Sequence, residues 1–270
     1  MTKKNPLVSI IVPCFNSAKT IKNTLETILA QSYTNLEVIV VSDGSTDDTV
    51  KIAKSIKDPR IQIIEKENGG VSTARNTGID AAKGQFVLFI DSDDRISETM
   101  VEKMLNRIIS HPNSLIVCGK LIGKRKISVP KDKTVTKNLP RHVVSSILKS
   151  GHLYSPCNKI FNLQLIKDNN IRFVKKVAFG EDLIFNLEYL KYVDSITYIK
   201  ECLYYYDMTA EGSSHRTKSD YKYRALMLEQ LRSYLGDEIK KPDIAIKYNL
   251  IQLRWQISTK RAKLKQGKKK

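Results

Sequence analysis

The chain has 270 residues, enough for one large α/β domain alone or with an added helical piece. Hydrophobic residues make up 41% and charged residues 27%, which excludes a disordered or low-complexity protein. The net charge of +18 is uneven, because residues 1–100 carry 12 basic and 13 acidic side chains whereas residues 101–270 carry 34 and 15. This surplus indicates a polyanionic partner, either nucleic acid or an anionic membrane surface.

The N-terminus predicts neither export nor membrane insertion. Residues 1–6 lead into an apolar run without a signal-peptide core, and no stretch reaches the ~18 apolar residues of a spanning helix. The four cysteines are scattered without a CxxC pair, which fits reduced thiols. We therefore expect a cytoplasmic protein that meets membranes only peripherally.

Strand and helix patterns alternate over the first hundred residues. Short runs rich in β-branched residues predict strands at 7–12, 36–42, 61–65 and 85–91. Helical spacing and start signals predict helices at 20–31, 47–56, 71–83 and 98–110. This order predicts an α/β fold with a doubly wound, mostly parallel sheet.

The remaining chain is less regular. A strand is expected at 114–119, a loop or hairpin up to Pro140, and helices at 141–150 and 183–192. A long helical region is expected from 221 to about 265, broken at Lys241-Pro242. We therefore divide the chain into residues 1–110, residues 111–220, and a basic, helical C-terminal extension at 221–270.

Each of the first four predicted strands ends in a polar cluster. Ligands of doubly wound sheets bind beyond the carboxyl ends of the strands, where these clusters converge. The clusters are Pro13-Cys14-Phe15-Asn16, Asp43-Gly44-Ser45, Asn68-Gly69-Gly70 and Asp91-Ser92-Asp93-Asp94. Together they predict a binding site at this edge.

Individual residues in these clusters leave two interpretations open. Asp91 and Asp93 could share a hard divalent cation, or could form a solvated turn. Asp43 could meet a base or ribose at its strand tip, or belong to a strand–helix turn. Arg75 could contact a phosphate, or pair with a neighbouring carboxylate.

Four segments in order resemble the signatures of family 2 glycosyltransferases, which have the GT-A fold. They are Val8–Asn16, Val41–Asp47, Ala74–Gly78 and Asp91–Asp94. The resemblance implies an inverting glycosyltransferase, with residues 1–110 binding a nucleotide-sugar donor, expected to be UDP-linked. It also implies a glycan acceptor, expected to be lipid-linked, in cell-surface polysaccharide synthesis.

The resemblance also implies roles for single residues. The nucleotide contacts would be Pro13, Phe15, Asn16, Asp43, Asn68, Arg75, Asp91 and Ser92. Asp93 would bind Mn²⁺ or Mg²⁺ on the donor diphosphate. His215 is a second candidate metal contact, with a structural or solvated histidine as the alternative.

Two segments in residues 111–220 resemble the family more loosely. Ser155–Phe161 resembles its WNK segment, with Pro156-Cys157 where tryptophan is more usual, and implies acceptor contacts by Asn158 and Lys159. Phe179–Leu183 resembles its GED segment, which implies Asp182 as general base with Glu181 at the acceptor, although this pair also fits a helix start. We expect Asp182 to be ionised at pH 7, with an ordinary pKa of ~3.9.

The alternative function is a basic nucleic-acid- or membrane-binding protein on an inactive scaffold of this fold. The basic runs lack interleaved aromatic residues and match no recognised module, so we expect no nucleic-acid partner. Intact acidic residues at 91, 93 and 182 argue against inactivity. A sugar-nucleotide pyrophosphorylase would need a glycine-rich basic loop where residues 13–16 stand.

The C-terminal helix is predicted to carry two apolar stripes. At 100° per residue, one stripe is Ile244, Tyr248, Ile251 and Trp255, and the roughly opposite one is Ile246, Leu250, Leu253 and Ile257. One stripe can pack on the domain. A second subunit, giving a homodimer, or an anionic membrane surface near the seven basic residues of the tail 260–270 could cover the other.

Overall fold

The computed structural model describes residues 5–123, 125–127, 131–149, 151–175, 177, 180–207 and 221–267. Four parallel strands form one half of its sheet in the order β3-β2-β1-β4. They are β1 (Val8–Cys14), β2 (Leu36–Asp43), β3 (Ile61–Lys66) and β4 (Phe86–Phe89). The connecting helices are α1 (Ile21–Leu29), α2 (Thr49–Ser55) and α3 (Val71–Ala81). The predicted parallel arrangement of the first hundred residues is confirmed.

The second half of the sheet is mixed. Strand β9 (Lys159–Asn162) lies between β4 and β6 (Ser114–Ile122) and runs antiparallel to both. Strand β10 (Ser195–Tyr206) runs parallel to β6, and β5 (Arg95–Ile96) closes this edge. The short strands β7 (Arg125–Ile127) and β8 (Lys133–Val135) pair with β6 and β10. Residues 1–110 and 111–220 therefore contribute to one continuous sheet.

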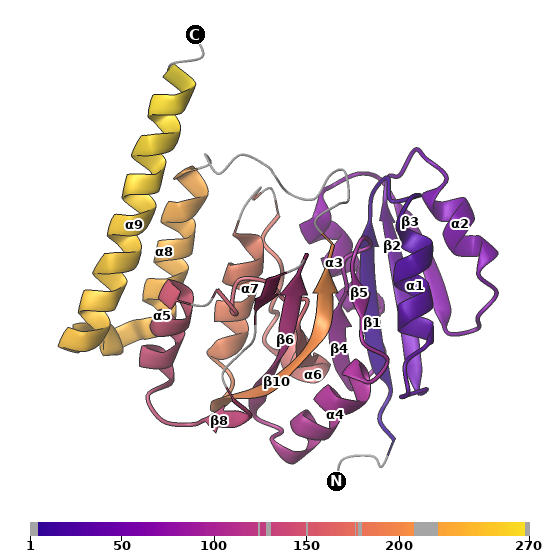
Figure 1. The fold of residues 1–270 in the computed structure, drawn as a ribbon, viewed down its shortest axis with the longest axis horizontal. Helices are drawn as coiled ribbons and strands as arrows, with labels where there is room; N and C mark the ends of the chain where they lie inside the picture. Colours follow the sequence, from indigo (N-terminus) through magenta and orange to yellow (C-terminus); the bar gives the residue numbers. More distant parts are fainter. Residues whose placement is uncertain are drawn as a thin grey trace.

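Helices cover both faces of this sheet, as Figure 1 shows. The remaining ones are α4 (Met100–Ser110), α5 (Leu139–Lys149), α6 (Leu163–Asp168), α7 (Glu181–Leu190), α8 (Tyr221–Leu235) and α9 (Pro242–Gly267). The predicted break before Pro242 is confirmed, since a short 3₁₀ turn (Gly236–Lys240) separates α8 from α9. Among the described residues we find no helix with the length and apolar content that crossing a bilayer requires.

Two hydrophobic layers form the core. Successive residues of β1 alternate between them, so that Ile10 packs with α1 and α4 whereas Ile11 packs on the side of α3 and α7. The second layer contains an aromatic cluster in which Phe173 and Phe185 stack with ring centroids 4.0 Å apart. Phe89, in β4, packs edge-on against both rings. This cluster is the floor beneath the carboxyl end of β4.

Candidate functional site

At the carboxyl edge of the parallel strands, Arg75 connects residues 1–110 with residues 111–220 of the chain. Its Nη2 donates to Asp91 Oδ1 at 2.8 Å, and its Nη1 donates to Asp182 Oδ1 at 2.7 Å. The Arg75 side chain is only 4% exposed, and its guanidinium lies 5.1 Å from the centroid of the Phe173 ring. Of the two interpretations left open by the sequence, the structure therefore shows the ion pair with neighbouring carboxylates.

A glycine starts the helix that carries Asp182. Gly180 precedes α7 with a φ of 96°, and a Cβ on it would lie 2.4 Å from Sδ of Met227 in α8. A side chain there would be both strained and too close to α8. The turn places Glu181 and Asp182 in the first turn of α7, where the helix dipole favours negative charge.

The expectation of an ordinary pKa for Asp182 is wrong. Although 27% of this side chain is exposed, burial raises the pKa of its carboxyl, and the Arg75 charge only partly opposes that effect. Burial, followed by repulsion from Asp91, raises the pKa of Asp93 to about 6. The site thus concentrates carboxylates that a cation or a proton would stabilise.

Asp94 has a structural partner. It is fully buried, accepts a hydrogen bond from the Tyr204 hydroxyl, and accepts another from the Asp207 backbone N–H at 2.9 Å. Burial raises the pKa of Asp94. These contacts fix the loop 91–94 against the end of β10, a role that the sequence did not predict for Tyr204.

The chemistry of Asp93 fits a divalent cation. Carboxylate oxygens are hard donors suited to Mg²⁺ or Mn²⁺. Burial is the main cause of the raised pKa of Asp93, and a cation would offset the second cause, which is repulsion from Asp91. Within the described ranges, no three His, Cys, Asp or Glu side chains form a preassembled metal site. A bound diphosphate would therefore have to supply further oxygens. His215, the other predicted metal contact, lies outside the described residues.

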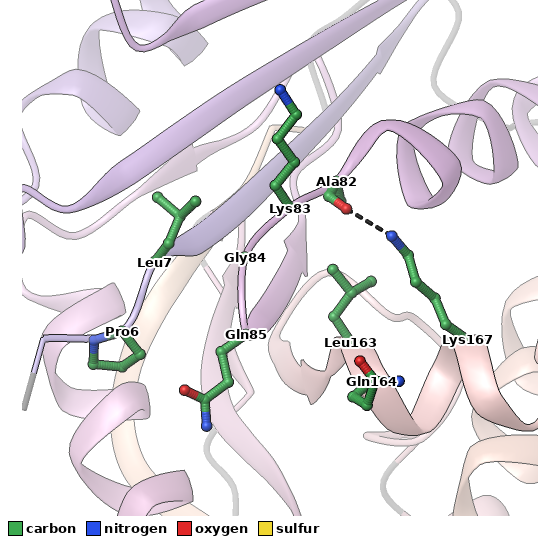
Figure 2. Close-up of a pocket in the computed structure, with 9 residues that line it drawn as sticks. All are labelled: Pro6, Leu7, Ala82, Lys83, Gly84, Gln85, Leu163, Gln164 and Lys167. Carbon is green, nitrogen blue, oxygen red and sulfur yellow. Dashed lines mark hydrogen bonds between the residues drawn. The ribbon is translucent and has the colours of Figure 1, made fainter. Parts of the chain in front are cut away.

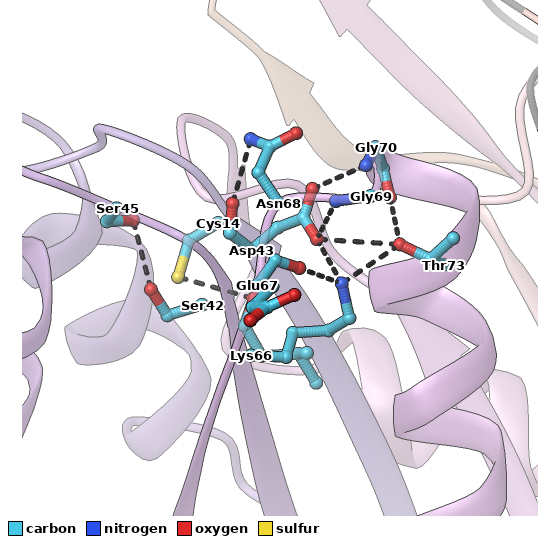
Figure 3. Close-up of polar contacts among 11 residues, drawn as sticks. Cys14, Ser42, Asp43, Ser45, Lys66, Glu67, Asn68, Gly69, Gly70 and Thr73 are labelled. Carbon is cyan, nitrogen blue, oxygen red and sulfur yellow. Dashed lines mark hydrogen bonds and ion pairs between the residues drawn. The ribbon is translucent and has the colours of Figure 1, made fainter.

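Asp43 organises the loop between β3 and α3 (Figure 3). Its Oδ1 accepts from Lys66 Nζ at 2.6 Å and from the Gly69 N–H at 3.0 Å, and its Oδ2 accepts from the Gly70 N–H at 2.7 Å. Asn68 Nδ2 donates to the Asp43 carbonyl at 2.9 Å. Thr73 Oγ1 makes a longer contact with Oδ1 at 3.4 Å, so these four partners occupy the roughly four acceptor positions of the carboxylate. The sequence interpretation missed Lys66, whose position at the end of β3 was the available signal.

The other predicted nucleotide contacts lie around the end of β1. Pro13 is buried within the strand, whereas the Phe15 ring is exposed just beyond it. Asn16 has a φ of 48° and accepts from the Thr46 N–H at 2.8 Å, which links this loop to the end of β2. Ser92 Oγ lies 2.8 Å from Ser17 Oγ. Phe15 therefore offers an open aromatic face beside a network of polar loops.

Asn158 and Lys159, the predicted acceptor contacts, are hydrogen-bonded inside the protein. Both are fully buried. Asn158 Nδ2 donates to the Cys118 carbonyl at 2.6 Å, and Lys159 Nζ donates to the His152 carbonyl at 2.7 Å, to Asn158 Oδ1 at 2.9 Å and to the Ser155 carbonyl. Burial, and then the Lys120 charge, lower the pKa of Lys159 to about 7. These residues hold the segment before β9 in place.

Cys157 and Lys120 also lie in this region, and neither was predicted as a site residue. Cys157 Sγ, at the position where the family more usually has tryptophan, contacts Asp91 Oδ2 at 3.3 Å. Lys120 is partly buried on β6 and interacts electrostatically with Cys157, Asp182 and Asp94, while burial lowers its pKa. Lys120 was not predicted because it is the first of many basic residues in the stretch 120–141, and nothing in the sequence distinguishes it from the others.

Two cavities are lined by none of Asp91, Asp93 and Asp182. A cavity of about 470 Å³ lies at the opposite edge of the sheet, before β1 and β4, and Figure 2 shows its lining. Its Lys167 Nζ donates to the Ala82 carbonyl at 2.7 Å, and it contains no carboxylate. A second cavity of about 360 Å³, lined in part by Arg95, Tyr205 and Asp207, lies beside the loop 91–94. The concentration of charged groups therefore identifies the candidate site.

The family model for glycosyl transferase family 2 matches residues 9–168, more than half of the chain. The chain belongs to this family. The chain is 31% identical over 225 residues to the uncharacterized glycosyltransferase EpsJ of Bacillus subtilis, covering 80% of this chain and 64% of EpsJ. It is 32% identical over 211 residues to the poly(ribitol-phosphate) beta-N-acetylglucosaminyltransferase TarS of Staphylococcus aureus, covering 76% of this chain and 36% of TarS.

A solved structure shows the same fold. The crystal structure of S. aureus TarS 1–349 in complex with UDP-GlcNAc superimposes with a TM-score of 0.70 at 25% identity, covering 94% of this chain and 79% of that one. The family and the GT-A fold expected from the sequence are both confirmed. This family 2 chain spans only about two thirds of EpsJ and about a third of full-length TarS.

Proposed function

We propose that this chain is an inverting glycosyltransferase that moves a sugar from a nucleoside diphosphate donor to a hydroxyl of a glycan acceptor. The pairing of Asp91 and Asp182 with Arg75 carries this proposal. The Arg75 guanidinium donates a hydrogen bond to Asp91, in the predicted donor region, and another to Asp182, the candidate base. This pairing places the candidate base next to the loop 91–94, which would hold the donor and its cation.

The donor is a UDP-sugar in this proposal, with a hexose or N-acetylhexosamine as the transferred group. The TarS structure, which contains UDP-GlcNAc, supports this choice. The exposed ring of Phe15 is suited to stack on a nucleobase, and the loop held by Asp43 follows β3 at the same edge of the sheet. Arg75 is a buried residue that positions Asp91 and Asp182 and does not itself contact the donor in this proposal.

Asp93 would hold Mn²⁺ or Mg²⁺ together with the donor diphosphate. When bound, the cation acts as a Lewis acid that offsets the charge of the departing nucleotide. Asp94 fixes the loop that carries Asp93, because it is bonded to Tyr204 and Asp207. This arrangement leaves Asp93 as the carboxylate free to face a ligand.

Asp182 would take the proton of the attacking hydroxyl. Its Oδ1 is bonded to Arg75, so Oδ2 is the oxygen available to the acceptor. A raised pKa makes the carboxylate a stronger base, provided that it is ionised at the working pH. Glu181, beside it in the first turn of α7, would contact the acceptor.

The acceptor would be a glycan of a cell-surface polysaccharide, carried on a lipid. The name of TarS, which describes transfer to poly(ribitol-phosphate), supports a polymeric surface acceptor. A screen of UDP release over a panel of UDP-sugars, without acceptor, tests the donor. We expect release above background for one or two donors, and uniform absence of release with Mn²⁺ and Mg²⁺ would contradict the proposal.

A further inference from the structure

Helix α9 presents an apolar stripe that no described residue covers. Figure 1 shows α9 at the outer edge of the molecule, alongside α8 and α5. The stripe consists of Ile246, Leu250, Leu253 and Ile257, whose exposed fractions lie between 43% and 60%. These residues include most of the large hydrophobic side chains that are exposed in the described chain.

The opposite stripe of α9 is anchored to the domain. Ile244 and Ile251 are buried, and Tyr248 and Trp255 pack against the same core. Arg224 donates to the Trp255 carbonyl at 2.8 Å, and Arg254 donates to the Leu148 carbonyl at 2.7 Å. Because these contacts fix the rotation of α9, the exposed stripe is a stable feature of its outer side.

The charge of this part of the chain indicates what covers the stripe. Residues 242–270 contain nine basic residues and one acidic residue, Asp243. That residue is already paired with Arg141 at 2.9 Å. Basic residues recur at 247, 254, 261 and 265, a spacing that follows one side of a helix next to the exposed stripe. The partner must therefore be both apolar and acidic.

A second copy of the chain satisfies these requirements poorly. Two such helices would bring like charges together, with no acidic row to oppose them. The four aliphatic side chains extend along only about 16 Å of helix at 1.5 Å per residue. A stable protein interface usually involves about 20–30 residues on each side.

We propose that the outer side of α9 docks on an anionic lipid surface. The aliphatic stripe enters the boundary between headgroups and acyl chains, while the flanking lysine and arginine residues contact acidic headgroups. The C-terminal end of α9 projects on the side toward which β6 and β10 point, which is the side of the carboxyl edge of the sheet (Figure 1). A lipid-carried acceptor could then reach the site without a spanning helix.

Vesicle sedimentation tests this proposal without requiring any transfer activity, so its failure is distinct from failure of the proposed function. Vesicles of phosphatidylglycerol mixed with phosphatidylcholine are compared with vesicles of phosphatidylcholine alone. We expect binding to the anionic vesicles only, weakening as salt rises. Equal binding to both vesicles, or no binding to either, would overturn the proposal.

Point substitutions are preferable to truncation, because removing α9 would also remove Ile244 and Ile251 from the core. Leu250→Gln with Leu253→Gln should weaken binding at least roughly tenfold. Arg261→Gln with Lys265→Gln, two positions of the basic row, should weaken it roughly 30-fold, at about 1 kcal/mol per basic residue.

The control is Gln252→Ala with Gln256→Ala, two changes on α9 outside the stripe, which should leave binding unchanged. Unchanged thermal unfolding midpoints would show that all variants are folded. Sedimentation velocity without lipid tests the alternative, in which a second copy of the chain packs on the stripe. A parent dimer that Leu250→Gln with Leu253→Gln converts to monomer would overturn lipid docking in favour of a second copy.

Discussion

Asp91 and Asp182 accept hydrogen bonds from the same guanidinium group, that of Arg75. Asp91 follows β4 and Asp182 lies in the first turn of α7, so Arg75 connects the predicted donor region with the helix that carries the predicted base. The guanidinium is buried above Phe173, whereas both carboxylates reach solvent. Arg75 therefore determines the separation between the predicted donor region and the predicted base.

Replacing Arg75 should cost more stability than an ordinary ion pair would. Arg75→Gln leaves two partly buried carboxylates without a cation, and we expect a loss of about 2–3 kcal/mol in unfolding free energy. Arg172→Gln is the control, because Arg172 pairs with the exposed Asp80 and should cost less than about 1 kcal/mol. Urea denaturation measures both. Equal losses would mean that the Arg75 pairing contributes no more than a surface pair.

Removing the Asp182 carboxylate should abolish proton transfer while preserving donor binding. Asp182→Asn is expected to reduce transfer by at least ~100-fold, since general-base catalysis contributes 10²–10⁴-fold. Glu181→Gln should reduce it much less. Steady-state rates and UDP calorimetry measure the two effects, and an Asp182→Asn enzyme with normal turnover would leave only the helix-start role.

The pH dependence of transfer follows from the raised pKa of Asp182. A general base works only when ionised, so activity should fall as the pH falls through this pKa, which lies well above that of a free aspartate. Arg75 lowers the pKa of Asp182, so Arg75→Gln should move this acidic limb to higher pH. A limb near pH 4 in the parent, or an unmoved limb in the variant, would contradict this assignment.

Asp93 should be required for metal-dependent nucleotide binding but not for folding. Asp93→Asn removes the carboxylate that would hold the cation, so UDP with Mn²⁺ should stabilise the variant much less than the parent in a thermal-shift experiment. UDP with a chelator provides the metal-free baseline for each protein. Equal stabilisation of the two proteins by UDP and Mn²⁺ would remove Asp93 as a ligand.

Lys159 should matter for stability rather than for acceptor affinity. Lys159→Met would leave three buried oxygen acceptors without their donor, and we expect a loss of about 3 kcal/mol. Lys167→Met, which removes a single bond to the Ala82 carbonyl, should cost about 1 kcal/mol. An increased acceptor KM in a folded Lys159→Met enzyme of normal stability would restore the acceptor role.

The sequence predicted the elements whose patterns are local. The four parallel strands, the helices between them and the break before Pro242 follow from apolar periodicity and proline geometry. Strand β9 was missed because its four residues become a strand only by pairing with β4 and β6, which are distant in sequence. Strand β10 was missed because Lys200-Glu201 interrupts its apolar pattern, at a register shift between Ile199 and Cys202.

The same limit applies to the site. Sequence motifs selected Arg75, Asp91 and Asp182, but only the folded chain shows that one guanidinium joins them. Lys159 was assigned to the acceptor because Ser155–Phe161 resembles the WNK segment of the family, whereas the folded chain shows that three oxygens accept hydrogen bonds from its amine inside the protein. The two stripes of α9 were predicted correctly, because a regular helix converts residue spacing directly into faces.

Inverting sugar transfer can be followed with water as the acceptor. Proton NMR records which anomer of the sugar is released from UDP-GlcNAc, an α-linked donor, before the anomers equilibrate. We expect UDP to form together with the β anomer, at a rate that Asp182→Asn lowers strongly. Release of the α anomer, or release that is unaffected by Asp182→Asn, would contradict the proposed mechanism.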